Sequence, residues 1–122
     1  MKYTQLGSTD LNVSRLCLGC WQLSPRFWGN VEIDQWEAAI RKGLDLGINF
    51  IDTANAYGEG YAEDCLGQLL QREKLRDDFI VATKVYWNFR QDKRHPDTRY
   101  THIIEECEDS LKRLRTDRID LY

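Results

Sequence analysis

Gly47 to Gly58 reads GINFIDTANAYG, and this stretch decides the fold expected of the chain. Its first half, at 49–53, is a short apolar run of the kind that forms a buried strand. The run ends at Asp52, a charge that a buried strand seldom holds, and Tyr57 follows in the next loop. Because parallel α/β sheets place their chemistry at the carboxyl ends of their strands, we expect these two side chains to mark a site.

Strand patterns and helix patterns alternate outward from this stretch. The expected elements, in chain order, are strands at 2–7 and 14–20, a loop at 21–30, a helix at 34–46, a strand at 49–53, a helix at 63–71, a strand at 78–85, a helix at 99–114 and the start of a strand at 118–122. Apolar strands that alternate with helices and have no wet face indicate a parallel sheet of the α/β class.

Length and charge narrow the range of partners. With 122 residues, 42% of them hydrophobic and 30% charged, the chain can bury one modest core, so we expect a single domain. A net charge of -3 and a pI of about 5.4 provide no field for nucleic acid or an anionic membrane, which leaves a small molecule as the expected partner. No window approaches the roughly 20 apolar residues of a transmembrane helix. No apolar stretch follows Lys2, so we expect a cytoplasmic protein without a secretory leader.

Four cysteines raise the alternatives of a metal site or a disulfide, and they are Cys17, Cys20, Cys65 and Cys107. Only the first two are closely spaced, and no second Cys or His pair follows at a ligand spacing, so we expect no metal. Their positions in strand and helix patterns instead predict reduced, buried thiols and a reducing compartment.

A second charge interrupts the next apolar strand, because Lys84 follows the run IVAT at 80–83. Consecutive parallel strands joined by one helix usually lie side by side, so we expect Asp52 and Lys84 to form an ion pair. An ammonium group beside a phenol favours the phenolate, and a tyrosine tuned this way can give a proton to a carbonyl oxygen. Each residue alone has an ordinary alternative, since a lysine at a strand end can reach solvent and a loop tyrosine can serve packing. Three groups converging on one sheet edge favour catalysis, with Tyr57 as the acid.

Motifs along the whole chain resemble the aldo-keto reductase family. They are K-Y-x-x-L-G-x-T-x-L-x-V-S-x-L-x-L-G at 2–19, D-T-A-x-x-Y-G at 52–58, G-E-G-x-x-E-x-x-L-G at 58–67, T-K at 83–84 and S-L-x-R-L-x-x-D-x-I-D-L-Y at 110–122. The first of them resembles the small hairpin that plugs the bottom of the family's barrel.

This resemblance implies an NADP-dependent reductase that converts an aldehyde or ketone to an alcohol on a (β/α)8 TIM barrel. Residues 1–122 would then be the truncated N-terminal portion of that barrel: the hairpin, about three strand-helix units and the start of a fourth strand. Asp52, Tyr57 and Lys84 match three of the family's four catalytic positions.

The resemblance also implies binding residues. The cofactor contacts would be Gly19, Cys20, Trp21 and Asp52, and the substrate contacts would be Trp21, Tyr57 and Trp87. Cys20 departs from the threonine often found at its position in the family. For Trp87, an exposed loop aromatic is the alternative.

The family's fourth catalytic residue, a histidine shortly beyond the D-L-Y motif, has no counterpart within residues 1–122. His95 and His102 are expected to be solvated surface residues, and the family's phosphate-binding segments also lie in later strands.

An open half-barrel exposes strand edges, so we expect self-association through them. The alternative function is a non-catalytic half-barrel that acts as a binding or assembly subunit. A flavodoxin-like binding module is disfavoured, because no phosphate-cradling glycine loop follows the first strand.

Overall fold

A parallel sheet of three strands organises the chain, and a computed structural model describes residues 1–89 and 94–122. The strands, in spatial order, are β3 (Leu18–Gly19), β4 (Phe50–Asp52) and β5 (Ile80–Ala82). Leu121 forms a parallel bridge to Ala82, at the point where the start of a fourth strand is expected. Every strand therefore lies beside the one that precedes it in the sequence, which confirms the predicted α/β sheet.

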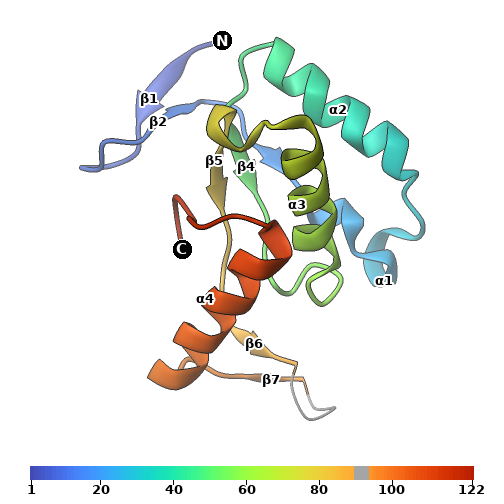
Figure 1. Cartoon of the computed structure of the whole chain (residues 1–122), viewed down its shortest axis with the longest axis vertical. Helices are drawn as coiled ribbons and strands as arrows, with labels where there is room; N and C mark the ends of the chain where they lie inside the picture. The colour runs from blue at the N-terminus through green and yellow to red at the C-terminus, as the bar shows by residue number, and fades with distance from the viewer. Residues whose placement is uncertain (90–93) are drawn as a thin grey trace.

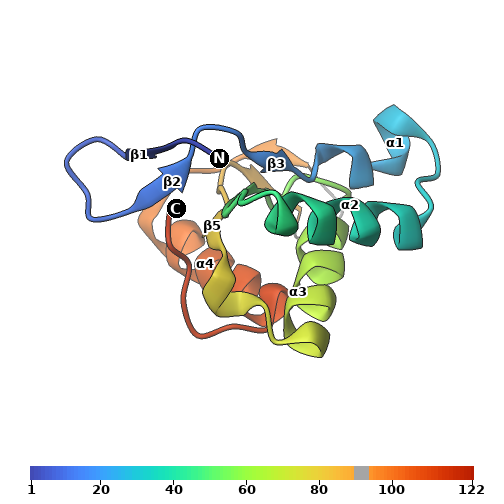
Figure 2. The same cartoon turned by 90° about the horizontal axis from the view of Figure 1, so that it is seen from above.

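Long helices connect these strands and lie on one side of the sheet (Figures 1 and 2). They are α2 (Ile33–Asp45), α3 (Tyr61–Glu73) and α4 (Tyr100–Leu114). The predicted loop at 21–30 is wrong in part, because it contains a 3-10 turn at Trp21–Leu23 and the short helix α1 (Pro25–Trp28). Pro25 occupies the first helical position, where its missing N–H is not needed.

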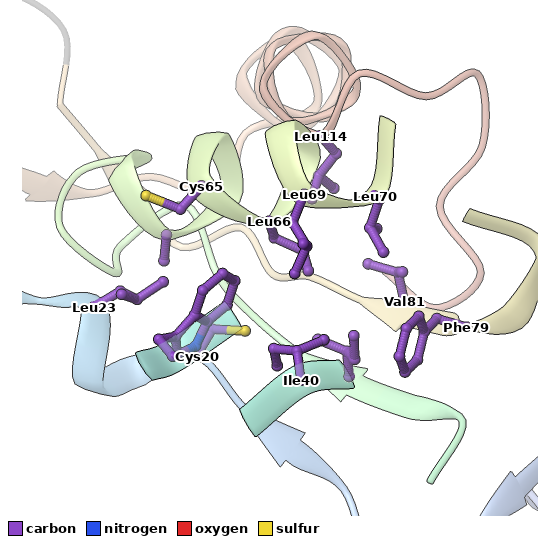
Figure 3. Packing of buried hydrophobic residues seen from close by; sticks show 13 residues of the cluster. Cys20, Leu23, Ile40, Cys65, Leu66, Leu69, Leu70, Phe79, Val81 and Leu114 are labelled. Carbon is purple, nitrogen blue, oxygen red and sulfur yellow. The ribbon is translucent and has the colours of Figure 1, made fainter. Parts of the chain in front are cut away.

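The hydrophobic core lies between the sheet and the three helices, as Figure 3 shows. Ile51 of β4 and Val81 of β5 are partners in register, so their side chains share the face that the helices cover. The helices contribute Trp36, Ile40, Leu66, Leu69, Leu70 and Leu114, all buried. The other face of β4 carries Phe50 and Asp52, which are only half-buried.

Helices α3 and α4 approach each other closely at Gly67. A Cβ atom added there would lie 2.2 Å from the carbonyl oxygen of Arg113 and 2.7 Å from the carbonyl carbon of Leu114. Any side chain at this position would therefore push α4 away from α3. This contact explains why the residue is a glycine despite the low helix propensity of glycine.

An antiparallel hairpin lies at the amino end of the sheet and is formed by β1 (Tyr3–Gln5) and β2 (Asn12–Ser14). Asn49, just before β4, fixes β2 in place: its Oδ1 accepts from the Ser14 amide at 2.7 Å and its Nδ2 donates to the Asn12 carbonyl at 3.0 Å. The predicted strand at 14–20 is thus wrong in its extent, since Ser14 belongs to the hairpin and only Leu18–Gly19 joins the parallel sheet. The hairpin covers the end of the sheet opposite to the predicted site.

The segment after β5 forms a second hairpin, β6 (Trp87–Asn88) with β7 (His95–Pro96). It lies beside the first turn of α4 (Figure 1), and residues of both line one pocket. His102, in that turn, is consequently buried, so its expected place on the surface is wrong, whereas His95 is exposed as predicted. The predicted strand at 78–85 is also too long, because Arg76–Asp78 form a 3-10 turn.

The cysteines are all free, but they are not all buried. Cys20 and Cys65 are buried as expected, Cys107 is partly buried and Cys17 is exposed. Among the residues that the structure describes, no helix is long and apolar enough to cross a membrane.

Candidate active site

A carboxylate, an ammonium group and a phenol meet at the carboxyl ends of β4 and β5. Asp52 is the last residue of β4, Lys84 lies two residues beyond β5, and Tyr57 lies in the connection from β4 to α3. The Lys84 ammonium donates to Asp52 Oδ1 at 2.6 Å, to the carbonyl oxygen of Thr53 at 2.9 Å and to the Tyr57 hydroxyl at 3.4 Å. The expected ion pair is confirmed, and the phenol lies within its reach.

This site is only partly screened from solvent in the described chain. The Lys84 side chain is 50% exposed and that of Asp52 is 35% exposed. The ion pair is therefore less buried than expected for two charges that interrupt apolar strands. Partial burial lowers the pKa of Lys84, but the hydrogen bond and the charge of Asp52 outweigh it, and the net pKa is raised. Lys84 is therefore a cation at neutral pH, and its Nζ also lies 5.1 Å from the centre of the Tyr57 ring.

Contacts on both sides hold the loop that carries Tyr57. The indole ring of Trp21 stacks on the phenol ring, with centroids 6.4 Å apart and planes inclined by 30°. The Gly58 amide donates to the buried hydroxyl oxygen of Ser24 at 2.7 Å, and Asn55 Nδ2 donates to the Trp87 carbonyl at 3.2 Å. The connection after β3 and the hairpin after β5 thus hold residues that precede and follow Tyr57 in its loop. Ser24 and Asn55 were not predicted, because no local pattern marks a polar residue that binds backbone far away in the sequence.

A buried charge network supports the backbone at Lys84. Thr83 Oγ1 donates to Glu63 Oε1 at 2.5 Å, and Glu63, which is wholly buried, accepts from Arg113 Nε at 2.6 Å. Arg113 also donates to Glu106 Oε1 at 2.5 Å. The network joins α3 and α4 to the residue before Lys84. Its only signal in the sequence is a glutamate inside an otherwise apolar stripe of α3.

The residues expected at the cofactor take different positions around Asp52. Gly19 is in register with Asp52, and a Cβ there would meet no atom within 4 Å, so the end of β3 leaves open space. The Trp21 side chain is half exposed beside this space. Cys20 is completely buried, and its amide donates to the Asp52 carbonyl at 2.9 Å. Burial, with the nearby Asp52 charge, raises the pKa of the Cys20 thiol, so this side chain serves the core and not the open space.

The open space at Gly19 and the exposed indole face of Trp21 fit a planar ring such as nicotinamide bound beside Asp52. Trp87 is less directly placed, since its ring packs on Tyr86 at 5.0 Å and under the Arg94 guanidinium at 4.5 Å. A role for Trp87 in a substrate pocket stays a prediction. Within residues 1–89 and 94–122, no group of three or more His, Cys, Asp or Glu side chains is placed to hold a metal ion.

Known proteins are similar to this chain over its whole length. Residues 15–122 match the Aldo/keto reductase family. The chain belongs to this family. As an aldo/keto reductase family member it is 39% identical over 122 residues to Aldo-keto reductase YhdN from Bacillus subtilis, with the whole chain and 37% of that protein aligned. It is also 34% identical over 122 residues to a probable voltage-gated potassium channel subunit beta from Oryza sativa, with 99% of the chain and 36% of that protein covered.

Solved structures of the family show the same architecture. Aldo-keto reductase AKR11C1 from Bacillus halodurans, in its holo form, superimposes with a TM-score of 0.86 at 40% identity, covering 100% of this chain and 39% of that one. The glycerol dehydrogenase AKR11B4 from Gluconobacter oxydans gives a TM-score of 0.77 at 35% identity, covering 96% of this chain and 37% of that one. The chain therefore spans about two fifths of the length of these relatives. Its hairpin and strand-helix units form part of a (β/α)8 barrel, as predicted.

Proposed function

We propose that the protein at its natural length is an NADP-dependent reductase that converts an aldehyde or ketone to an alcohol, and that residues 1–122 provide the N-terminal portion of its barrel. The observation that carries this proposal is the contact of one ammonium group with both a carboxylate and a phenol: Lys84 Nζ lies 2.6 Å from Asp52 Oδ1 and 3.4 Å from the Tyr57 hydroxyl. Family membership supports the same reaction class.

The roles of the three side chains follow from their charges. When bound, the nicotinamide cofactor supplies the hydride that the carbonyl carbon receives. Tyr57 donates its hydroxyl proton to the carbonyl oxygen, and the Lys84 cation stabilises the phenolate that remains. Asp52 orients the Lys84 ammonium and keeps it protonated. Gly19, Trp21 and Asp52 would hold the nicotinamide end of the cofactor, since they border the open space at the end of β3.

Further parts of the active site are proposed to come from sequence beyond Tyr122. The described chain spans 37% of the length of YhdN and 39% of AKR11C1, so most of such a barrel lies outside it. A histidine soon after the D-L-Y motif would complete the catalytic group, and later loops would hold the cofactor phosphates. We also propose a cytoplasmic location, which the four free thiols support.

The first test is to sequence the natural transcript through the codons after Tyr122 and to assay the encoded protein. Oxidation of NADPH that depends on an added aldehyde or ketone supports the proposal. A folded protein of natural length that neither binds NADPH nor consumes it with any carbonyl compound refutes it.

A second candidate is a non-catalytic binding or assembly subunit. One relative is named as a probable potassium channel subunit beta, so similarity to family members does not by itself establish turnover. In this proposal the open edges of the sheet, of which β3 forms one, pair with a strand of another chain. Light scattering distinguishes this candidate, since a folded protein that is strictly monomeric would exclude edge pairing.

A further inference from the structure

A pocket of about 170 Å³ lies against the loop that carries the reactive phenol. Ala56 and Gly58, the neighbours of Tyr57 in the sequence, form one side of it. Arg26 of α1 and Arg94, just before β7, reach it from two other parts of the chain. We refer to it as the Arg26–Arg94 pocket.

Both arginines of this pocket are exposed, and neither forms an ion pair with a carboxylate of the described residues. Each guanidinium instead lies over an aromatic ring: Arg26 Cζ is 5.7 Å from the centre of the Phe27 ring, and Arg94 Cζ is 4.5 Å from that of Trp87. Stacking of this kind fixes the plane of a guanidinium and leaves the N–H groups at its edge available to an anion. The pocket thus presents two oriented groups of anion donors.

The surrounding charge is compatible with this role. Among the described residues that line the pocket, Glu59 is the one carboxylate, against two guanidinium groups, and it forms an ion pair with neither. A larger surface groove between the ends of α3 and α4 also contains arginines, but there Arg76 pairs with Asp120 at 2.8 Å and Arg118 with Asp77 at 2.8 Å. Guanidinium groups without a carboxylate partner in residues 1–89 and 94–122 therefore distinguish the Arg26–Arg94 pocket from that groove.

Aromatic side chains connect this pocket with the phenol. The Trp21 ring lies 6.4 Å from the Tyr57 ring and 6.1 Å from the ring of Phe27, which itself lines the pocket. Trp21 and Phe27 are about half exposed, at 48% and 57%, so their faces are open to a bound molecule. An extended apolar compound can lie along these rings with its carbonyl group at Tyr57 and its other end in the pocket.

We propose that the Arg26–Arg94 pocket binds an anionic group, carboxylate or phosphate, at the far end of an elongated carbonyl substrate. This inference rests on the proposed reductase function, because it assigns the substrate class of the same site. Two guanidinium groups suit such a group, since each can donate a pair of N–H bonds to its oxygens.

The test compares aldehydes that differ only in charge. The protein at its natural length, with NADPH, is assayed with 4′-formylbiphenyl-4-carboxylate and with its neutral methyl ester, and kcat/KM is measured for each. Arg26→Gln and Arg94→Gln should each lower the ratio of acid to ester by about fivefold, the effect of losing one exposed ion pair. Arg15→Gln is the control, because it removes the same charge far from the pocket. Arg15 lies before β3, whereas Trp21 lies after it. An unchanged ratio in both pocket variants overturns the proposal.

A binding measurement separates this proposal from the reductase function. The side-chain N–H signals of Arg26 and Arg94 are followed by NMR while biphenyl-4-carboxylate, which has no carbonyl to reduce, is added. Saturable shifts of these signals, absent with the methyl ester of the same compound, support the pocket even if the protein reduces no aldehyde. If biphenyl-4-carboxylate shifts neither arginine signal at its highest soluble concentration, the proposed anion site is overturned, whether or not the protein reduces an aldehyde.

Discussion

Replacing Lys84 by methionine removes the cation beside Tyr57 while keeping a side chain of similar length. At 3.4 Å, an ammonium attracts a phenolate by about 5 kcal/mol if the effective dielectric constant is ~20. Because the Lys84 side chain is 50% exposed, solvent screening reduces this to roughly 2.5 kcal/mol. A barrier raised by about 2.5 kcal/mol corresponds to roughly a 70-fold loss of kcat/KM.

The assay is NADPH-dependent reduction of an aldehyde by the protein at its natural length, with circular dichroism to confirm folding. Lys112→Met is the matched control, because Lys112 pairs with Asp109 at 2.9 Å on an exposed part of α4. The Asp52 side chain is already 35% exposed, so Lys84→Met should lower the free energy of unfolding by only about 1 kcal/mol. A folded Lys84→Met protein that keeps more than about a third of the wild-type kcat/KM would refute the assigned role of Lys84.

Further predictions concern the phenol, the charge network, the helix contact and the pH dependence. Tyr57→Phe should abolish carbonyl reduction while NADPH affinity, measured by fluorescence titration, stays nearly unchanged; undiminished turnover would remove Tyr57 from the mechanism. Glu63→Gln should lower the free energy of unfolding in urea by about 3 kcal/mol, because it leaves Arg113 without one of its two carboxylates, and a change below about 0.5 kcal/mol would contradict this. Gly67→Ala should cost at least about 2 kcal/mol, since the added methyl group meets the α4 backbone; an equal or higher melting temperature would show that the helices can separate freely. The folded-state pKa of Lys84 is raised above its ordinary 10.5, so its pairing stabilises the fold below that pH and is lost as pH rises through the folded value. As the pH rises above 10.5, the free energy of unfolding should therefore fall more steeply for the wild type than for Lys84→Met. Parallel plots of this free energy against pH would contradict the raised pKa.

The sequence predicts those features that depend on periodicity and on neighbouring strands. Consecutive apolar runs joined by one helix lie side by side, so the pairing of Asp52 with Lys84 could be inferred before the structure was known. The resemblance to a family added the (β/α)8 barrel and the role of Tyr57, which spacing alone could only suggest.

Other features depend on contacts between distant segments and leave little local signal. Glu63 is buried because α4 crosses α3 at Gly67 and brings Arg113 to it. His102 lies in the first turn of a helix, where a surface position is expected, yet it is buried beside the β6–β7 hairpin. Cys17 occupies an apolar pattern in the sequence but is exposed, and it lies just before β3 (Leu18–Gly19), outside the parallel sheet.

The order of the strands has a consequence for synthesis on the ribosome. Leu18, Ile51, Val81 and Leu121 lie on successive strands, and each later strand adds to the edge left by the one before it. A nascent chain can therefore extend its sheet in the direction of translation, without any strand waiting for a partner that has not been made. The N-terminal hairpin is the exception: its β2 strand is held by Asn49, so it cannot be seated until the following strand is about to emerge.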